Sequence, residues 1–189
     1  MDLAVVNHED YLAKIGDDHK FPINKFGELA DYLLKKKIVK KFYKPYPCSD
    51  ETLQRAHSEK YIKDIKNKTL NTEGIKKIGF PLVESVVKRS LVATGGTVLA
   101  SKLAIKNGVA CNTAGGSHHA TFDSGAGYCV FNDVAVASQY LLDRGLAGKI
   151  LILDLDVHQG NGNSEIFKNN QNVFTFSMHS KSNYPAKKS

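Results

Sequence analysis

Residues 149–162, KILILDLDVHQGNG, constrain the fold of this chain more than any other segment. The apolar run at residues 150–153 is typical of a strand that is buried on both faces of a parallel sheet. Asp154, Asp156 and His158 then occupy alternate positions, and alternate side chains of an extended segment point the same way. Because ligands bind beyond the carboxyl ends of strands in open α/β sheets, this spacing predicts a metal or catalytic site at the end of the strand.

Strands and helices are expected to alternate along the rest of the chain. The expected strands are residues 3–7, 109–112, 150–154 and 173–178. The expected helices are residues 26–39, a helix from residue 51, residues 61–65, 81–107 and 133–144, and a helical turn at 164–168. Residues 67–79 and 113–131 are expected to be loops, and Gly95 and Gly96 to mark either a close packing contact or a break in the long helix. This order predicts one α/β domain, residues 1–189, with a parallel sheet.

Composition restricts the class of protein. Hydrophobic residues make up 42% and charged residues 24% of the chain, which is ordinary for a globular domain, and no apolar stretch is long enough to span a bilayer. Three scattered cysteines and the lack of an export signal favour the cytoplasm. The net charge of +7 comes mostly from scattered lysines without a nucleic-acid-binding motif, so a solvated surface is favoured over specific nucleic-acid binding. Weak attraction to an acidic partner is the alternative.

A second informative segment is residues 114–120, AGGSHHA, in which His118 and His119 follow two glycines. A lone histidine is more often structural than functional, but packing explains a pair in a Gly-rich loop poorly. Together with the downstream Asp-x-Asp-x-His segment, the pair supplies two imidazoles for proton transfer and two ligands for a metal.

Three segments in this order resemble signature blocks of the zinc-dependent histone deacetylase family: residues 115–120 (GGSHHA), 127–133 (GYCVFND) and 154–162 (DLDVHQGNG). Residues 56–62 (AHSEKYI) match an earlier helix, and residues 21–26, His179 and residues 183–185 resemble the class IV branch and its bacterial relatives. The resemblance implies a three-layer arginase/deacetylase-like fold, with helices on both faces of a parallel sheet. It also implies hydrolysis of an N-acetyl or longer N-acyl amide.

The resemblance implies two kinds of metal site. Asp156 and His158 would be zinc ligands, and zinc would polarise the amide carbonyl and lower the pKa of a bound water. A structural monovalent cation, usually potassium, would lie beside Asp154, with Ser177 and the carbonyl of Met178 among its ligands. Phe167 and Val173 would offer carbonyls to a second cation, and the side chains of these two residues and of Met178 are expected to be core.

The remaining roles implied by the resemblance concern the catalytic histidines and the substrate. His119 would be the general base and acid, and His118 would stabilise charge. Asp154 would orient His118 by a hydrogen bond, and Asn161 would do the same for His119 more weakly, because a neutral amide stabilises an imidazolium less than a carboxylate does. Two neighbouring residues would contact the acyl-lysine, Gly127 through its carbonyl and Tyr128 as a wall of the channel.

The sequence departs from the family pattern after residue 158. The family takes its third zinc ligand, an aspartate, and an oxyanion-stabilising tyrosine from later blocks. After His158 the only acidic residue is Glu165, which is expected on the exposed side of a helical turn. The chain is therefore interpreted as the N-terminal portion of a deacetylase domain, incomplete at its C-terminal side and with an unpaired sheet edge.

Two hypotheses of different class follow from this departure. The chain is either a zinc-dependent deacetylase of acyl-lysine side chains, completed by further sequence or by a second chain, or a catalytically inactive product of a split or frameshifted gene. Small acetylated amines such as polyamines are an alternative substrate class to acyl-lysine proteins.

Overall fold

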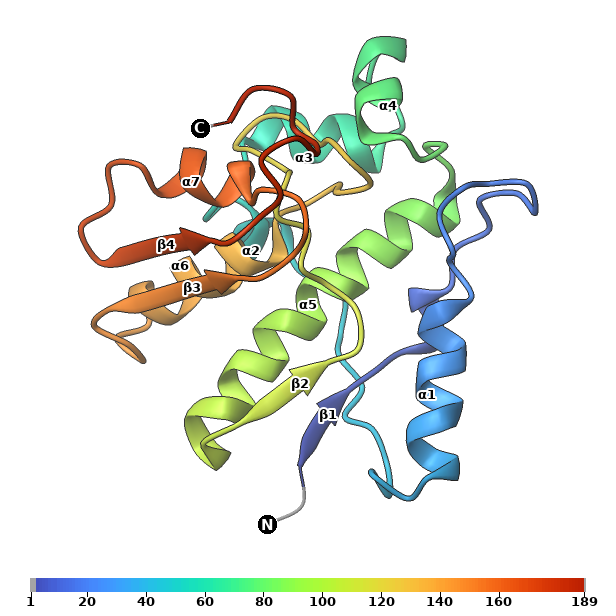
Figure 1. Ribbon diagram of the computed structural model, residues 1–189, viewed down its shortest axis with the longest axis vertical. Helices are drawn as coiled ribbons and strands as arrows, with labels where there is room; N and C mark the ends of the chain where they lie inside the picture. Colours follow the sequence, from blue (N-terminus) through green and yellow to red (C-terminus); the bar gives the residue numbers. More distant parts are fainter. Residues whose placement is uncertain (1–2, 189) are drawn as a thin grey trace.

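The computed structural model describes residues 3–188 and shows an α/β fold with parallel strands (Figure 1). The predicted domain limits, residues 1 and 189, lie outside the described part of the chain. In chain order the elements are β1 (Ala4–Val6), the 3-10 helix η1 (Glu9–Tyr11), α1 (Lys25–Lys35), α2 (Asp50–Leu53), α3 (Glu59–Lys66), α4 (Thr72–Ile78), α5 (Glu84–Asn107), β2 (Ala110–Asn112), α6 (Asp133–Asp143), β3 (Ile150–Asp154), α7 (Asn161–Phe167) and β4 (Val173–Ser177).

The strands form two parallel pairs. β1 pairs with β2, with Ala4 opposite Ala110, and β3 pairs with β4, with Asp154 opposite Ser177. Helix α5 packs against β1, β2 and α6, and Figure 1 shows it running through the middle of the molecule. The strand segments predicted from the sequence are confirmed, and each pair ends near the segments that carry the histidine and aspartate motifs.

Gly95 and Gly96 do not break α5, which runs without interruption through both residues. A Cβ on Gly95 would lie 2.1 Å from the carbonyl oxygen of Tyr46, and one on Gly96 would lie 2.1 Å from the hydroxyl of Tyr11. The alternative of a close packing contact is therefore confirmed. Both glycines let neighbouring segments approach the helix backbone.

One helix was missed, and the limits of several others differ from the prediction. Residues 72–78, expected in a loop, form α4, because the Asn71 side chain caps the helix by accepting from the N–H of Gly74, and Gly79 ends it in the left-handed conformation. The long helix begins at Glu84 and not at Pro81, because Val83 has extended backbone. Helix α1 ends at Lys35, short of residue 39, and α7 begins at Asn161, before the predicted turn.

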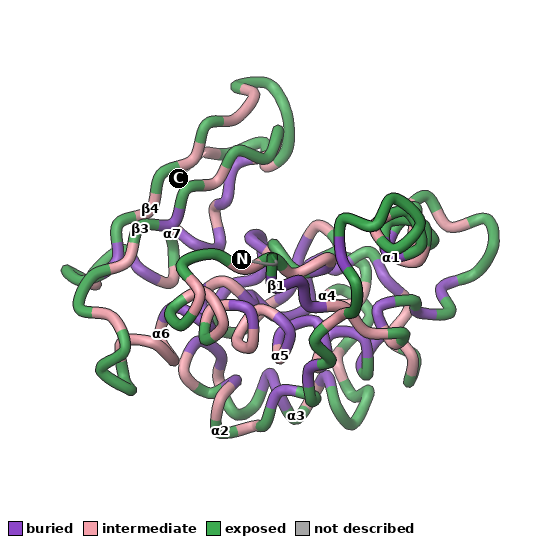
Figure 2. Tube along the Cα trace, turned by 90° about the horizontal axis from the view of Figure 1, so that it is seen from below, coloured by how far each residue is buried: buried purple, intermediate pink, exposed green. Residues whose placement is uncertain are grey.

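The prediction that β3 is buried on both faces was also wrong. Ile152 is 7% exposed, but Leu151 and Leu153 are 61% and 58% exposed, and Phe174 of β4 is 67% exposed. Figure 2 shows β3 and β4 at one side of the molecule. The inner face of this pair packs on the core, whereas its outer face stays exposed within residues 3–188.

The main core lies between α3, α5, α6 and the inner face of the β3–β4 pair. Its fully buried members include Leu53, Ile62, Ile65, Val86, Phe131 and Val136. Phe167 and Val173 belong to this core, as expected. Met178 does not, since its side chain is 64% exposed. Among residues 3–188, no helix combines the length and apolar character needed to cross a membrane.

Candidate active site

The histidine pair lies on the irregular segment between β2 and α6, and the first turn of α7 packs directly against it. The N–H of Gly162 donates to the carbonyl of His118 over 2.9 Å. A Cβ on Gly162 would lie 2.3 Å from the carbonyl oxygen of Ala120, so only glycine fits at this crossing. This contact brings together the two motifs that are separated in the sequence.

Both predicted orienting hydrogen bonds are present. Nδ1 of His118 is 2.6 Å from Oδ2 of Asp154, and Nδ1 of His119 is 2.8 Å from Oδ1 of Asn161. The two imidazole ring centroids are 4.1 Å apart, and both rings are buried. Burial lowers the pKa of His119, and the hydrogen bond to Asn161 opposes this only in part. A lowered pKa favours the neutral form of the His119 ring.

Asp156 and His158 form a second pair beside the histidines. Nδ1 of His158 is 3.0 Å from Oδ1 of Asp156, which also accepts from the backbone N–H of His158 over 2.7 Å. Burial raises the pKa of Asp156, but the His158 N–H and the nearby His118 and His158 rings outweigh it, so the pKa lies below its ordinary value. The extended geometry expected for this segment ends at Asp154, whose carboxylate turns toward His118.

The donors present fit part of a zinc site. A carboxylate oxygen and an imidazole nitrogen are zinc ligands, and those of Asp156 and His158 face the same cavity. Within residues 3–188, however, no group of three or more His, Cys, Asp or Glu side chains is arranged to hold a metal ion. Glu165, the only later acidic residue, lies exposed on α7, as expected.

A cavity of about 640 Å³ joins the predicted site residues. Its lining includes His118, His119, Gly127, Tyr128, Asp156, His158 and Tyr184. A Cβ on Gly127 would lie 2.6 Å from the His119 ring, so a side chain there would displace the imidazole. The sequence therefore assigned the correct segments to one cavity, although the roles of the individual residues stay predictions.

Tyr184 is a lining residue that the sequence did not assign to the site, and it lies directly against the histidines. Its ring meets that of His119 edge-on, with centroids 4.8 Å apart, and lies 6.3 Å from the ring of His158. The available signal was the Asn-Tyr-Pro sequence at residues 183–185, which was read only as a mark of the class IV branch.

The C-terminal end of α4 and a cluster of aromatic rings hold Gly127 and Tyr128 in place at the cavity. The Tyr128 N–H donates to the carbonyl of Ile78 over 2.6 Å, and the Gly127 N–H donates to that of Lys77 over 3.0 Å. The Tyr128 ring centroid lies 5.2 Å from those of Phe21 and Phe80. The helix missed in the sequence therefore holds one wall of the cavity.

The residues assigned to a monovalent cation lie together at the ends of β3 and β4. The Met178 N–H donates to the Asp154 carbonyl over 3.0 Å, and the Ser177 hydroxyl accepts from the Gly160 N–H over 3.3 Å. The exposed Met178 side chain corrects the expectation of a core position, because it projects from the uncovered part of the sheet.

Comparison with known proteins places this geometry in a family. The model of the histone deacetylase domain matches residues 19–189. An uncharacterized protein of Picosynechococcus sp. is 43% identical over 190 residues, which cover 100% of this chain and 63% of that protein. Histone deacetylase 2 of Arabidopsis thaliana is 31% identical over 175 residues, covering 88% of this chain and 45% of that protein.

The fold comparison agrees. The crystal structure of an HDAC homologue complexed with SAHA superposes with a TM-score of 0.86 at 26% identity, covering 100% of this chain and 54% of that one. The arginase/deacetylase-like fold is thereby confirmed, and the chain spans about half to two-thirds of the length of these relatives. The paired histidines, the Asp-x-Asp-x-His segment and these similarities together show that this chain belongs to the histone deacetylase family.

Proposed function

We propose that this chain provides the proton-transfer groups and two of the metal ligands of a zinc-dependent hydrolase that removes acetyl or longer acyl groups from lysine side chains. The observation that carries the proposal is the pair of orienting hydrogen bonds, His118 to Asp154 and His119 to Asn161, beside Asp156 and His158 at one cavity. In a deacetylase family member, this arrangement suits hydrolysis of an amide.

Each residue has a distinct part in the proposed reaction. Bound zinc, held by Asp156 and His158, would polarise the acyl carbonyl and acidify water. Neutral His119 accepts a proton from the attacking water at Nε2, since its Nδ1–H donates to Asn161. The same ring then donates that proton to the leaving lysine amine. His118 stabilises the negative charge that develops, and the Asp154 carboxylate keeps its ring oriented.

Charge along the cavity favours acyl-lysine over small acetylated polyamines. Lys25, Lys76 and Lys77 line the cavity together with the buried Arg89, whereas Asp156 is the one carboxylate in its lining within the described chain. A polyamine keeps positive amines close to its acetylated end, and these would meet like charges. An acyl-lysine with neutral or acidic neighbours avoids that repulsion.

A monovalent cation, potassium, is proposed at the ends of β3 and β4. The Asp154 carboxylate, the Ser177 hydroxyl and the carbonyl of Met178 would supply its oxygen ligands. The support is the close backbone contact between Asp154 and Met178 in the paired strands. A cation there would offset the charge of Asp154 next to His118.

A further polypeptide segment is proposed to complete the metal site. Catalytic zinc normally has three protein ligands, and the described residues arrange only two. The matched region covers 54% of the HDAC homologue, and the outer β3–β4 face is apolar and uncovered. A segment equivalent to the remainder of that homologue, continuous with this chain or separate, would cover the face and bring the third ligand and the oxyanion-stabilising group.

The test measures zinc content and acetate release from an acetyl-lysine peptide. The chain is assayed alone and with the unmatched part of the Picosynechococcus relative as a separate polypeptide, and His119→Ala is the matched control. We expect little acetate release alone, and stoichiometric zinc and turnover in the mixture that His119→Ala abolishes. A mixture that forms a stable complex and binds zinc but releases no acetate contradicts the hydrolase proposal. Failure to form a complex favours the inactive split-gene product.

A further inference from the structure

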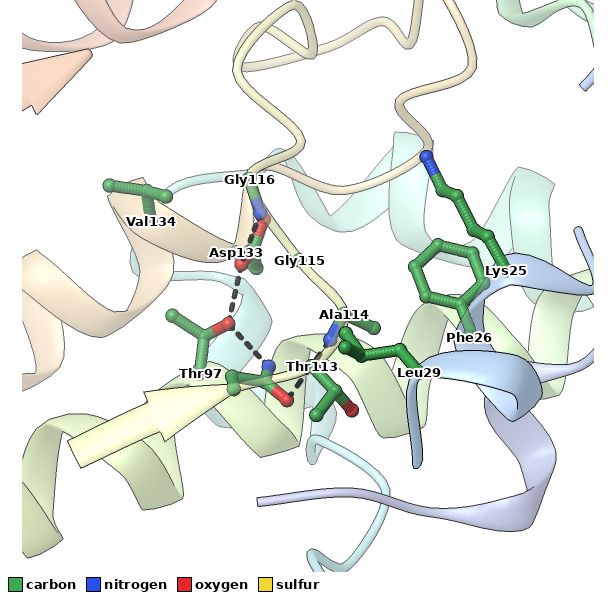
Figure 3. Close-up of a pocket in the computed structure, with 11 residues that line it drawn as sticks. Lys25, Phe26, Leu29, Thr97, Thr113, Ala114, Gly115, Gly116, Asp133 and Val134 are labelled. Carbon is green, nitrogen blue, oxygen red and sulfur yellow. Dashed lines mark hydrogen bonds between the residues drawn. The ribbon is translucent and has the colours of Figure 1, made fainter. Parts of the chain in front are cut away.

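Asp133, the first residue of α6, is a buried acid that points at the histidine loop. It is 1% exposed. Its carboxylate accepts from the backbone N–H of Gly116 over 3.0 Å and from that of Ser117 over 2.7 Å, and from the Thr97 hydroxyl over 2.5 Å. Figure 3 shows this carboxylate between α5 and the loop that leads to His118.

Asp133 belongs to a larger buried polar network. The Asn112 side-chain N–H donates to the Thr97 hydroxyl over 3.0 Å, and the Asn112 oxygen accepts from the Tyr11 hydroxyl over 2.8 Å. The same oxygen accepts from the backbone N–H of Ala114 over 3.4 Å. The side chains of Asn112 and Asp133 therefore accept from three backbone amides of the loop at residues 114–117, and Tyr11 and Thr97 hydrogen-bond to these two side chains. Figure 3 shows the part of this network that joins Thr97, Asp133 and Gly116.

The loop at residues 114–117 depends on these hydrogen bonds because its own sequence does not define one conformation. Gly115 and Gly116 have φ values of +107° and +74°, in the region that favours glycine. A Cβ on Gly115 would lie 2.4 Å from Oδ2 of Asp133, so the carboxylate occupies the space directly beneath the loop. Glycines lose much conformational entropy when they are fixed, and the charge-assisted hydrogen bonds that the loop amides donate to Asp133 offset that loss.

Capping of α6 does not account for the position of Asp133. An acid in the first turn of a helix is favoured by the helix dipole. The N-cap contact of α6, however, is made by Asn132, whose side chain accepts from the Ala135 N–H over 2.9 Å. The Asp133 carboxylate has its hydrogen-bond partners on the loop and on α5.

We propose that Asp133 is a positioning residue for the catalytic histidines, an inference that rests on the hydrolase function proposed above. By fixing the amides of Gly116 and Ser117, Asp133 sets the backbone from which His118 reaches Asp154 at 2.6 Å. Misplacement of reacting groups by even a fraction of an ångström lowers the rate of catalysis. Loss of the Asp133 contacts therefore loosens the histidine pair while the rest of the fold stays in place.

The test compares Asp133→Asn with Thr97→Val by amide hydrogen exchange and histidine ring NMR. Asp133→Asn keeps the side-chain volume but loses one acceptor for the loop, and Thr97→Val removes only the α5 contact. Because a charge-assisted hydrogen bond is worth roughly a tenfold change in an opening equilibrium, the Gly116 and Ser117 amides should exchange about tenfold faster in Asp133→Asn and less so in Thr97→Val. The ring signals of His118 and His119 should shift, and those of His19 should not.

The outcomes separate this inference from the function on which it rests. In the active assembly, Asp133→Asn should lower kcat with KM nearly unchanged. If exchange of the loop amides accelerates but neither the wild type nor any variant releases acetate, the hydrolase proposal fails. The positioning of the loop by Asp133 is then still supported. Unchanged exchange at Gly116 and Ser117, or equal acceleration throughout α3 and α5, overturns the positioning role. If Asp133→Asn does not fold, the same comparison is made on Thr97→Val, with a threefold local acceleration as the expected result and none as the contrary one.

Discussion

His57 shows at the scale of one residue how a motif histidine outside the cavity supports the fold. It is buried, and its Nε2 accepts from the Asn132 N–H over 2.8 Å at the start of α6. Only an unprotonated Nε2 can accept this bond. Burial lowers the pKa of His57 to about 4, and the backbone groups of Thr121 and Phe122 oppose this shift only in part.

Because the His57 ring must be neutral to accept this hydrogen bond, we expect the stability of the protein to depend on pH. The pKa of His57 is 6.5 in the unfolded state and about 4 in the folded state, so between these pH values the unfolded state binds more protons. The free energy of unfolding therefore falls as the pH drops from 6.5 to 4. The contribution approaches about 1.4 kcal/mol per pH unit. Urea unfolding between pH 7 and pH 5 measures it. His57→Gln should be less stable at pH 7 but show a shallower pH dependence, and equal slopes for the two proteins would contradict the assignment.

Helix α5 shows at the element scale that a poor helix former can be required by packing. Alanine favours a helix over glycine by about 1 kcal/mol, yet the Cβ of an alanine at position 95 would lie 2.1 Å from the Tyr46 carbonyl oxygen. The obstacle is backbone and not the end of a flexible side chain. The N–H of Cys48 also donates to the Leu91 carbonyl over 2.9 Å, so this crossing is fixed on both sides.

Gly95→Ala should therefore destabilise the protein by roughly 1–3 kcal/mol, the usual cost of overpacking. Gly27→Ala in α1 is the matched control, because the nearest atom to its Cβ is a methyl carbon of Leu12 at 3.2 Å, which can move. That change should be neutral or stabilising by a few tenths of a kcal/mol. Denaturant midpoints of the two variants compare them directly, and a Gly95→Ala protein as stable as wild type would refute the packing argument.

The uncovered face of the β3–β4 pair is the main feature at the scale of the whole molecule. Leu151, Leu153 and Phe174 form a contiguous apolar surface next to the segment that carries Asp156 and His158. Apolar patches of this kind usually mark an interface. Completion of the metal site and coverage of this face would then be one event.

Leu151→Lys should leave the unfolding free energy of the isolated chain within about 0.5 kcal/mol of wild type, because the side chain is already 61% exposed. It should also reduce self-association and the binding of a hydrophobic dye. Ile152→Lys on the opposite face should destabilise by several kcal/mol, since it buries a charge. Sedimentation, dye fluorescence and urea unfolding measure the three effects. Similar destabilisation by both substitutions would show that the outer face is covered.

Local chemistry made much of the molecule predictable. The strand at residues 150–154, the Asn132 cap and the stop at Gly108 follow from apolar runs, capping side chains and glycines, each of which acts within a few residues. The histidine pair and the Asp-x-Asp-x-His segment were also found, because packing explains paired histidines and alternating acids poorly. Gly127 and Tyr128 were assigned to the cavity only through the family resemblance. Helix α4 was missed because its few apolar residues give no clear period, and Tyr184 because its partners lie far away in the sequence.

The sequence by itself determined the order of the strands and of all α-helices but α4, the parallel α/β class and the residue types available for proton transfer and metal binding. Only the tertiary structure decided which face of β3 is buried and that Asp133 holds the loop beneath the histidines. The physical reason is the distance along the chain over which each interaction acts. Propensity and capping act between neighbours along the chain, whereas burial and the pairing of buried polar groups depend on segments that meet only after folding.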